Sequence, residues 1–393
     1  MSIPTTEAIL ADLVAFPTLS RSPNGALVDY VRGLLAPTGA VVEVVAGHGA
    51  EDGSRSNLWV TLGPADKPGI VLSGHSDVVP VAGQAWSRDP FCLSEAEGRL
   101  YGRGAADMKG FLAAALRCAL LAARRPLATP LHLAISCDEE VGCVGVRSLL
   151  GWLAQRPTRP QLVWIGEPTE MALASGHKGK RVWRATCHGR AAHSALAPSG
   201  LNAIHLAADF VVGLRAIQAD LAAKGLADAA YAVPWSTLHV GTISGGEALN
   251  IVAPTCVVDY ELRDVAGEDV AAITARIAAL AQAIAAPHLA AFPEAAITIE
   301  ERNAYPGLAS ASAPALAFMR ALSGSNGPPV KLAFGTEGGL FAGELGVPAV
   351  ICGPGSMDQG HKPDEYVTRS QLALCDAMLA RLVDRLEAGV SLG

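Results

Sequence analysis

The sequence is poor in the features of metal–thiolate proteins and of small secreted proteins. Its eight cysteines are scattered and include no CxxC pair. This spacing argues against a zinc site of clustered thiolates and against the dense disulfide framework of a small secreted domain. We therefore expect reduced cysteines and a cytoplasmic protein. For Cys137 and Cys143, which flank an acidic stretch, we expect small buried side chains rather than redox chemistry.

The chain also lacks an excess of positive charge. It has 30 Lys and Arg against 37 Asp and Glu, a formal net charge of −7, which argues against nucleic acid or an anionic membrane as the main partner. No uncharged apolar run reaches the roughly 18 residues of a membrane-spanning helix. The N-terminal segment MSIPTTEAILADLV has no basic start, so we expect a helix capped by Thr5 or Thr6 rather than a signal peptide.

Three common catalytic motifs are missing. The segment GRGAAD begins like a dinucleotide-binding loop, but Asp107 occupies the third glycine position and would repel phosphate. The segment GPGSMDQG does not match the GxSxG pattern of serine hydrolases. No GxxxxGKS or GxxxxGKT sequence is present, so a P-loop is not indicated either.

What the sequence does contain is the composition of a well-packed globular protein, with half of its 393 residues hydrophobic. Up to about residue 177, apolar strands such as GIVLSGHS, LHLAIS and QLVWIGE alternate with helices. A buried helix is expected over residues 108–123, with Asp107 as its cap. This alternation predicts an α/β fold with a mostly parallel sheet covered by helices.

A different pattern begins near residue 179. Strands such as KRVWRATCHG and CVVDYELRD alternate apolar and polar residues, with long helices expected at about 201–224 and 267–285. This pattern predicts an α+β unit with helices on one face of an antiparallel sheet. Because the first pattern resumes after residue 299, we predict one domain in two parts, residues 1–178 and 299–393, and a second domain, residues 179–298, inserted into it.

Carboxylates and imidazoles follow the strands of the first domain or occupy the adjoining loops. They are His75 and Asp77, Asp107, Glu139 and Glu140, Glu167, and His361. Ligands of open parallel sheets bind beyond the carboxyl ends of the strands, so we expect these side chains to share one rim. Each residue alone has an ordinary alternative, such as a helix cap, a loop acid or a structural histidine.

Two imidazoles and several carboxylates, without thiolates, suit zinc, manganese or cobalt. One four-coordinate ion cannot use so many carboxylates. They suit two ions about 3.5–4 Å apart, bridged by one carboxylate, which together generate a hydroxide nucleophile and polarise a carbonyl. A further carboxylate must then act as the general base, and the pair Glu139 and Glu140 can divide these tasks.

These motifs resemble the di-zinc aminoacylase and carboxypeptidase superfamily, and within it the acetylornithine deacetylase family. The resemblance covers nearly the whole chain and rests on GHSDVVPVAGQAWSRDPF, LYGRGAADMKGF, CDEEVG, GEPTEM, HKG, GRAAHSALAPSGLNAI, HVGTISGGEALNIVAP, ELR, FGTEGGLF and CGPGSMDQGHKPDEYV. It implies a di-zinc exopeptidase-like domain with an inserted ferredoxin-like dimerisation domain. It also implies a small N-acyl amino acid as the substrate. The apolar helix faces of the inserted domain, with residues such as Ile204, Ala207, Phe210 and Val211, predict a homodimer.

The resemblance implies roles for the residues at the strand ends. Two Zn²⁺ ions, or Co²⁺ or Mn²⁺ in their place, are expected on His75, Asp107, Glu140, Glu167 and His361, with Asp107 bridging. Glu139 is expected to be the general acid/base. Asp77 is expected to accept a hydrogen bond from the imidazole of His75 and to orient it.

In the inserted domain the resemblance implies three further functional residues. His193 is expected to help hold the oxyanion in the partner subunit's active site, unless it is a plain surface histidine. Asn250 and Arg263 are expected to grip the substrate's α-carboxylate, although Arg263 could instead form a surface ion pair. Gly335 and Thr336 resemble the start of a substrate-facing turn, whose glycines could also serve only the backbone.

The chain departs from the family pattern at Ala105 and Ala106, where many relatives have Thr or Ser, and this leaves the substrate open. The expected reaction is deacetylation of N2-acetyl-L-ornithine to L-ornithine and acetate, in arginine biosynthesis. The alternatives are a desuccinylase or another N-acyl amino acid deacylase, and a non-catalytic binding protein on the same scaffold.

Overall fold

The computed structural model describes residues 2–392, which form two compact units. Unit 1 comprises residues 2–176, 310–331 and 336–392, and unit 2 comprises residues 177–309 and 332–335. The second unit is thus inserted into the first. It extends past the boundary expected at residue 298, because the strand Ala296–Tyr305 (β12) continues to pair with its neighbour as far as Tyr305.

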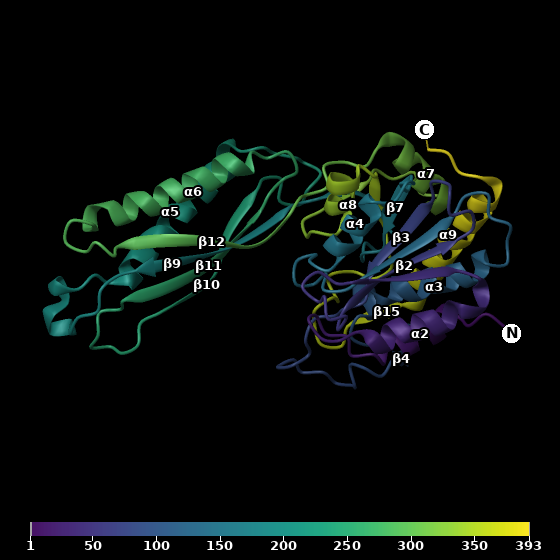
Figure 1. Ribbon diagram of the computed structural model, residues 1–393, viewed down its shortest axis with the longest axis horizontal. Coiled ribbons are helices and arrows are strands. Elements are labelled where there is room, and N and C mark those ends of the chain that lie inside the picture. Colours follow the sequence, from purple (N-terminus) through teal and green to yellow (C-terminus); the bar gives the residue numbers. More distant parts are fainter. Residues whose placement is uncertain (1, 393) are drawn as a thin grey trace. The chain divides into compact units, whose positions relative to one another are not determined.

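Unit 1 is built on an eight-stranded sheet in the order β1-β2-β6-β3-β7-β14-β8-β13. Figure 1 labels three of these strands, β2, β3 and β7. The strands are β1 (Val41–Ala46), β2 (Ser56–Leu62), β3 (Ile70–His75), β6 (Leu131–Ser136), β7 (Leu162–Ile165), β8 (Ala174–His177), β13 (Val330–Leu332) and β14 (Ala349–Ile351). The four central strands, β6, β3, β7 and β14, run parallel, whereas β1, β2 and β8 pair antiparallel. This confirms the predicted α/β fold with a largely parallel sheet.

Helices cover both faces of this sheet. One layer holds α1 (Thr6–Val14), α2 (Gly25–Leu35), α3 (Gly110–Ala122), α7 (Ala313–Ser323) and α9 (Arg369–Ala388), and the other holds α4 (Val146–Ala154) and α8 (Gly338–Leu345). Alternation along β2 explains the two layers, because Leu58, Val60 and Leu62 join the core of the α3 layer while Trp59 and Thr61 face away from it. A small sheet, in the order β15-β5-β4, adds β4 (Ser94–Ala96), β5 (Arg99–Tyr101) and β15 (Tyr366–Thr368).

The expectation that Asp107 caps the helix after it is wrong. A turn over Ala105–Lys109 (η2) precedes α3, which begins at Gly110. Asp107 has non-helical dihedral angles (φ −121°, ψ 95°) inside that turn, and its carboxylate lies beside two histidines instead of the first amides of the helix. Tertiary partners have therefore overridden the local capping preference.

Unit 2 has the order of elements β9 (Lys180–His188), α5 (Ala203–Lys224), β10 (Thr237–Gly245), β11 (Thr255–Arg263), α6 (Val270–Ala285) and β12. Its antiparallel sheet has the strand order β10-β11-β9-β12, and α5 and α6 lie along one face (Figure 1). This β-α-β-β-α-β arrangement is the ferredoxin-like topology that was expected.

One helical stretch, Val270–His288, is long and apolar enough to cross a membrane by length and composition. It comprises α6 and a short 3₁₀ turn. The residues Ile273, Ile277, Ala281 and Ala285 recur every four positions and are buried in the core of unit 2 or at its edge. The helix therefore has the amphipathic pattern of a helix that covers a sheet.

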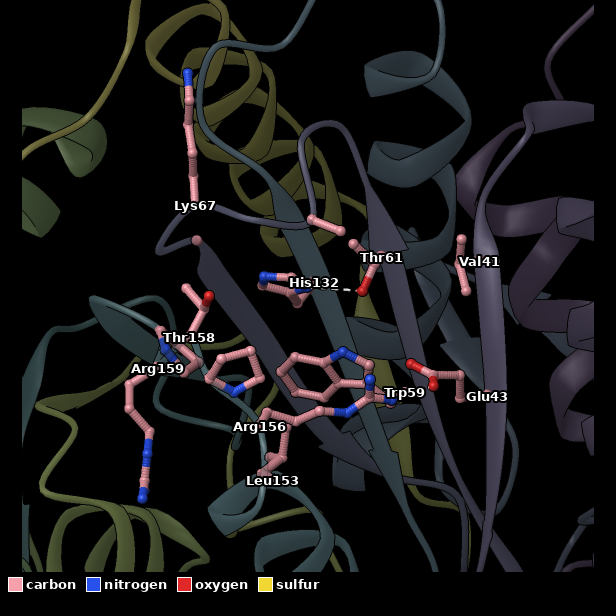
Figure 2. A pocket seen from close by; sticks show the side chains of 14 residues that line it. Val41, Glu43, Trp59, Thr61, Lys67, His132, Leu153, Arg156, Thr158 and Arg159 are labelled. Atoms are coloured by element: carbon pink, nitrogen blue, oxygen red, sulfur yellow. Dashed lines mark hydrogen bonds and ion pairs between the residues drawn. The ribbon is translucent and has the colours of Figure 1, made fainter.

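A pocket of about 220 Å³ opens on unit 1 at the start of β6, at the opposite end of that strand from the acidic stretch (Figure 2). His132 lines it and stacks on Trp59 with ring centroids 4.7 Å apart, and its Nδ1 is 3.0 Å from the hydroxyl of Thr61. Burial lowers the pKa of His132 to about 4, so its imidazole is neutral at pH 7. Of the pocket's cations, Arg156 is already paired with Glu43.

Candidate metal centre

The residues predicted at the strand ends come together at the carboxyl edge of the parallel strands. His75 is the last residue of β3, the acidic stretch follows β6, Glu167 follows β7 and His361 lies in the loop after β14. Asp107 comes from the turn before α3. Five separate segments of unit 1 thus supply one cluster, as parallel strand order requires.

Asp107 lies between the two imidazoles of the cluster. Its Oδ1 is 3.0 Å from Nε2 of His75, and its Oδ2 is 3.1 Å from Nε2 of His361. His361 Nε2 also lies 3.0 Å from Oε2 of Glu140, and His75 Nε2 lies 3.9 Å from Oε1 of Glu167. A carboxylate that offers one oxygen to each half of a site has the disposition of a bridging ligand.

Two overlapping groups within this cluster could each hold an ion. One consists of His75, Glu139 and Glu167, and the other of His75, Asp107 and Glu140, with the ligand atoms of each group within 4.8 Å of one another. His361 adds a further nitrogen to the second group. The donor set of imidazole nitrogen and carboxylate oxygen fits zinc, cobalt or manganese.

The electrostatics of the cluster also fit bound cations. Burial, together with neighbouring carboxylates, raises the pKa of Glu139 to about 8 and of Glu140 to about 7, and raises the pKa of Glu167 well above its usual value. Burial would likewise raise the pKa of Asp107, but hydrogen bonds from His361 and His75 outweigh it and hold that pKa well below its usual value. So many buried acids are hard to ionise together unless a cation compensates them.

The third acid of the stretch after β6 does not belong to the cluster. Asp138 has a left-handed backbone conformation (φ 53°). Its carboxylate accepts hydrogen bonds from Nε of Arg55 at 2.6 Å and from the backbone N–H of Arg21 at 2.6 Å. Of the three consecutive acids, only Glu139 and Glu140 therefore face the candidate metals.

Asp77 supports the cluster in a different way from the one expected. Nδ1 of His75 lies 2.9 Å from the backbone carbonyl of Asp77, whereas the nearest carboxylate oxygen is 3.7 Å away. The carboxylate instead accepts hydrogen bonds from the backbone N–H groups of Glu139 at 3.0 Å and Glu140 at 3.3 Å, and from the hydroxyl of Ser20 at 2.7 Å. Asp77 therefore holds the backbone that carries both glutamates.

Cys143 is a neighbour of Glu139 that no sequence pattern connects with the site. Its Sγ donates to Oε1 of Glu139 across 3.1 Å, and it is fully buried. The spacing of four residues after an acid was the available signal, but it is uninformative outside a helix, and residues 139–143 form a turn. The contact leaves the second oxygen of Glu139 available for proton transfer.

Two of the candidates in unit 2 are neighbours. His193 and Asn250 are both exposed, and they lie on adjoining loops because the backbone N–H of Ser194 donates to the carbonyl of Asn250 at 2.9 Å. His193 caps the short 3₁₀ helix Ser194–Ser199, where its Nδ1 accepts from the N–H of Ala195 at 3.1 Å.

Arg263 does not join these two residues within unit 2. It ends β11, about 26 Å along the strand from Thr255 at about 3.3 Å per residue, whereas Asn250 precedes the start of that strand. Its guanidinium pairs with Glu261 at 3.0 and 3.3 Å. Arg263 therefore forms an ion pair, the alternative to its expected role in carboxylate binding.

Gly335 and Thr336 are constrained by packing. A Cβ at Gly335 would lie 2.2 Å from the ring of Tyr305, so only glycine fits this approach. Thr336 is fully buried, and its hydroxyl accepts a hydrogen bond from the N–H of Gly338 at 3.0 Å, at the start of α8. In both residues the observed contacts serve the backbone of the loop.

The chain is similar to proteins of known family over nearly its full length. Residues 71–385 match the family described as Peptidase family M20/M25/M40. An acetylornithine deacetylase of Myxococcus xanthus is 32% identical over 384 residues, 97% of each chain. Another, of Pasteurella multocida, is 29% identical over 98% of this chain and 99% of its own. These relatives confirm the resemblance seen in the motifs.

Solved structures show the same fold. An aminopeptidase PepT of Bacillus cereus superposes with a TM-score of 0.74 at 19% identity, over 99% of this chain and 100% of its own. A metallo-carboxypeptidase of Sulfolobus solfataricus, Sso-CP2, gives 0.73 at 16% identity, over 98% and 100%. With the family match and the cluster of metal-binding side chains, these findings lead to one conclusion: the chain is a metal-dependent hydrolase and belongs to peptidase family M20/M25/M40.

Proposed function

We propose that the protein hydrolyses the amide bond of N2-acetyl-L-ornithine and releases acetate and L-ornithine, as a cytoplasmic step of arginine biosynthesis. The observation that carries the proposal is the position of Asp107 between His75 and His361, with the buried Glu139 beside them. That arrangement suits metal-assisted amide hydrolysis. The names of the relatives favour this substrate within that chemistry.

In this proposal five side chains hold two divalent ions, Zn²⁺ or alternatively Co²⁺ or Mn²⁺: His75, Asp107, Glu140, Glu167 and His361. The ions, when bound, polarise the acyl carbonyl and acidify a water molecule. Glu139 accepts a proton from the attacking water at Oε2, since Cys143 occupies its Oε1. It then delivers this proton to the nitrogen of the departing amine. Asp77 keeps Glu139 and Glu140 in place through their backbone amides.

Residues of unit 2, together with Thr336 of unit 1, complete the proposal. His193 donates to the oxyanion, and Asn250 and Arg263 bind the α-carboxylate, with the backbone of Gly335 and Thr336 lining the substrate. Because Asn250 and Arg263 lie at opposite ends of β11, one copy of unit 2 cannot bring both to a substrate only a few Å across. The proposal therefore includes a homodimer in which two copies contribute to each site.

The helix face expected to form the dimer contact is not free, since Ala207 and Phe210 are buried in the core of unit 2. The edge of unit 2 offers a surface for the homodimer instead. β10 is an edge strand, and residues 241–250 at its end and in the following loop are all exposed. Ile243, Leu249 and Ile251 are 52%, 102% and 39% exposed, and unpaired apolar edges favour association. Light scattering should give twice the mass of the chain for the wild type, and the monomer mass for Leu249→Asp combined with Ile243→Asp.

The test of function is a measurement of amine release from N2-acetyl-L-ornithine beside N2-succinyl-L-ornithine, other N-acyl amino acids and dipeptides. Each substrate is measured before chelation, after chelation and after zinc is added back. Chelator-sensitive hydrolysis that is fastest with acetylornithine supports the proposal. If another acyl amino acid is fastest, the deacylase alternative replaces it. If a dipeptide is fastest, the activity follows the peptidases that share the fold.

A further inference from the structure

Unit 1 contains a buried carboxylate that has no part in the proposed reaction. Glu365 lies in the loop just before β15 and is 1% exposed. Both of its carboxylate oxygens face the turn that carries Asp107. Its burial so close to the candidate metals calls for an explanation, because a buried carboxylate is costly unless it is fully compensated.

The compensation comes from the turn itself. Oε1 of Glu365 accepts from the backbone N–H groups of Ala106 at 2.9 Å and Asp107 at 3.0 Å. Oε2 accepts from the N–H of Gly104 at 3.1 Å and from Nη1 of Arg103 at 2.6 Å. Charge-assisted hydrogen bonds of this kind are among the strongest in proteins. Four donors from residues 103–107 therefore converge on one carboxylate, and they fix the backbone from which the Asp107 side chain projects.

A second arm of the same network reaches the other candidate ligand. Arg103, also 1% exposed, donates through Nη2 to Oε1 of Gln84. The amide nitrogen of Gln84 in turn donates to the backbone carbonyl of His361 at 2.9 Å. His361 needs such support because it lies in a loop, has a left-handed backbone conformation (φ 61°) and is itself exposed.

We propose that Glu365 is a positioning residue for both halves of the metal centre. It sets Asp107 directly through two backbone amides, and it sets the backbone of His361 indirectly through Arg103 and Gln84. The inference rests on the proposed metal centre and deepens it. It adds that the affinity for two metals depends on a carboxylate that touches neither of them, in the way that hydrogen-bonding partners of ligands tune other metal sites.

The substitution Glu365→Gln tests this proposal. It keeps the size and shape of the side chain, but it replaces one hydrogen-bond acceptor oxygen by an NH₂ group that donates. Whichever way the new amide turns, its NH₂ group faces either the two N–H groups or the guanidinium and the N–H of Gly104. Gln84→Ala is the complementary variant, since it removes the link to His361 and leaves the amides of Asp107 bound to Glu365.

Asp376→Asn is the control for a purely structural role. Asp376 lies on α9, and its two carboxylate oxygens lie 2.7 and 2.9 Å from the hydroxyl of Thr6, which donates to them. Asp376 therefore also joins distant parts of unit 1. It makes no contact with Asp107 or His361 among the hydrogen bonds and ion pairs of the described residues. A variant that only loosens the unit should behave like this control.

The measurement is zinc binding to the metal-free full-length protein in competition with a chromogenic chelator, together with the melting temperature in excess chelator. For Glu365→Gln we expect both zinc affinities to fall by about 10- to 100-fold. For Gln84→Ala we expect one of the two affinities to fall, and for Asp376→Asn neither. The melting temperatures of all three variants should decrease, but the size of the decrease should not follow the number of zinc affinities lost.

Wild-type zinc affinities in both Glu365→Gln and Gln84→Ala would overturn the inference and leave the proposed metal centre standing. If Glu365→Gln does not fold, Gln84→Ala alone decides: loss of one affinity supports the network, and retention of both overturns it. If the wild type binds none of zinc, cobalt and manganese in the same competition, the metal centre fails and the inference fails with it.

Discussion

The candidate functional residues of unit 1 are buried and contact one another, whereas those of unit 2 are exposed. In unit 1, His75, Asp107 and Glu167 are 1%, 5% and 4% exposed and lie within hydrogen-bonding or ion-pair distance in one cluster. In unit 2, His193 and Asn250 are exposed. Burial and proximity give the first set its shifted pKa values. The second set is exposed, and in the proposed function it acts only when it meets another surface.

This difference shows which of the two sets of residues needs a bound cation. Unit 1 keeps several acids out of water, so its cluster is incomplete without a compensating charge. The ion pairs of unit 2, such as Arg184 with Asp259 at 2.8 Å, lie at its surface, where they contribute little to stability. Loss of a metal ligand in unit 1 should therefore alter chemistry, metal binding and stability together, whereas loss of an exposed candidate in unit 2 should alter mainly catalysis.

The largest effect is expected for Glu139→Gln in unit 1. The amide cannot accept the proton of the attacking water, so turnover should fall by about 10³-fold or more, while zinc content stays at the wild-type value. Steady-state kinetics with metal analysis checks both parts. Glu170→Gln, at an exposed glutamate of the same unit, is the matched control. Turnover above one tenth of wild type would remove Glu139 from the proposed role.

Metal removal should produce the next largest effect, and only unit 1 should respond. Zinc at about a thousand times its dissociation constant stabilises a folded site by about 4 kcal/mol. In the metal-free protein Glu139 and Glu140, with pKa values of about 8 and 7, favour the folded state at low pH. That stability is lost as pH rises through those values.

The metal-free protein should therefore become less stable between pH 6.5 and 8.5. The pKa of His361 is raised to about 10 because its imidazole donates hydrogen bonds to Asp107 and Glu140. This shift acts in the same direction, since its contribution to stability also declines over this pH range. Urea unfolding at several pH values, with and without zinc, checks the prediction. A metal-free protein whose stability rises over this range would contradict it.

His193→Ala in unit 2 should change catalysis without changing the fold. Loss of an oxyanion donor costs about 10²- to 10³-fold in kcat. The exposed side chain makes one capping contact, so the unfolding free energy should fall by no more than about 1 kcal/mol. His188→Ala, at a partly exposed histidine on the same unit, is the control. Equal kcat in the two variants would show that His193 is a plain surface residue.

The sequence predicted that the residues of the unit 1 cluster lie together, because their position follows from topology. Parallel strands end at one edge, so His75, Glu140, Glu167 and His361 could be grouped without knowing any distance. The two-part organisation followed from the change in hydrophobic periodicity near residue 179. In each case a local sequence pattern indicates how segments that are distant in the sequence are arranged in the fold.

The sequence could not predict which partners each side chain contacts at the carboxyl edge of the parallel strands. Asp107 has the sequence signal of a helix cap and no such role, and Asp77 holds backbone amides where an imidazole partner was expected. Glu365 lies in the motif HKPDEYV, but the sequence does not indicate which groups its side chain contacts. The separation of Asn250 and Arg263 likewise required the register of β11, which the sequence pattern does not specify.

The smallest expected effect is on the acid stability of unit 1, away from the metal centre. Burial lowers the pKa of His132 to about 4, below its unfolded value of about 6.5. Its contribution is therefore present above pH 6.5 and is lost as pH falls towards 4. His132→Gln keeps a partner for Thr61 and removes the titration. Urea unfolding in chelator should show a shallower decline between pH 6.5 and 4.5 for this variant, by on the order of 2 kcal/mol.

The histidine of the other unit sharpens this last comparison. His188→Gln is the control, because it alters a partly exposed ring that contacts only the hydroxyl of Thr298 among the hydrogen bonds of the described residues. Because the metal-centre carboxylates titrate identically in both variants, the difference between the two profiles isolates His132. If the profiles coincide, the imidazole of His132 is hydrated well enough through the pocket of Figure 2 to accept a proton without unfolding the unit.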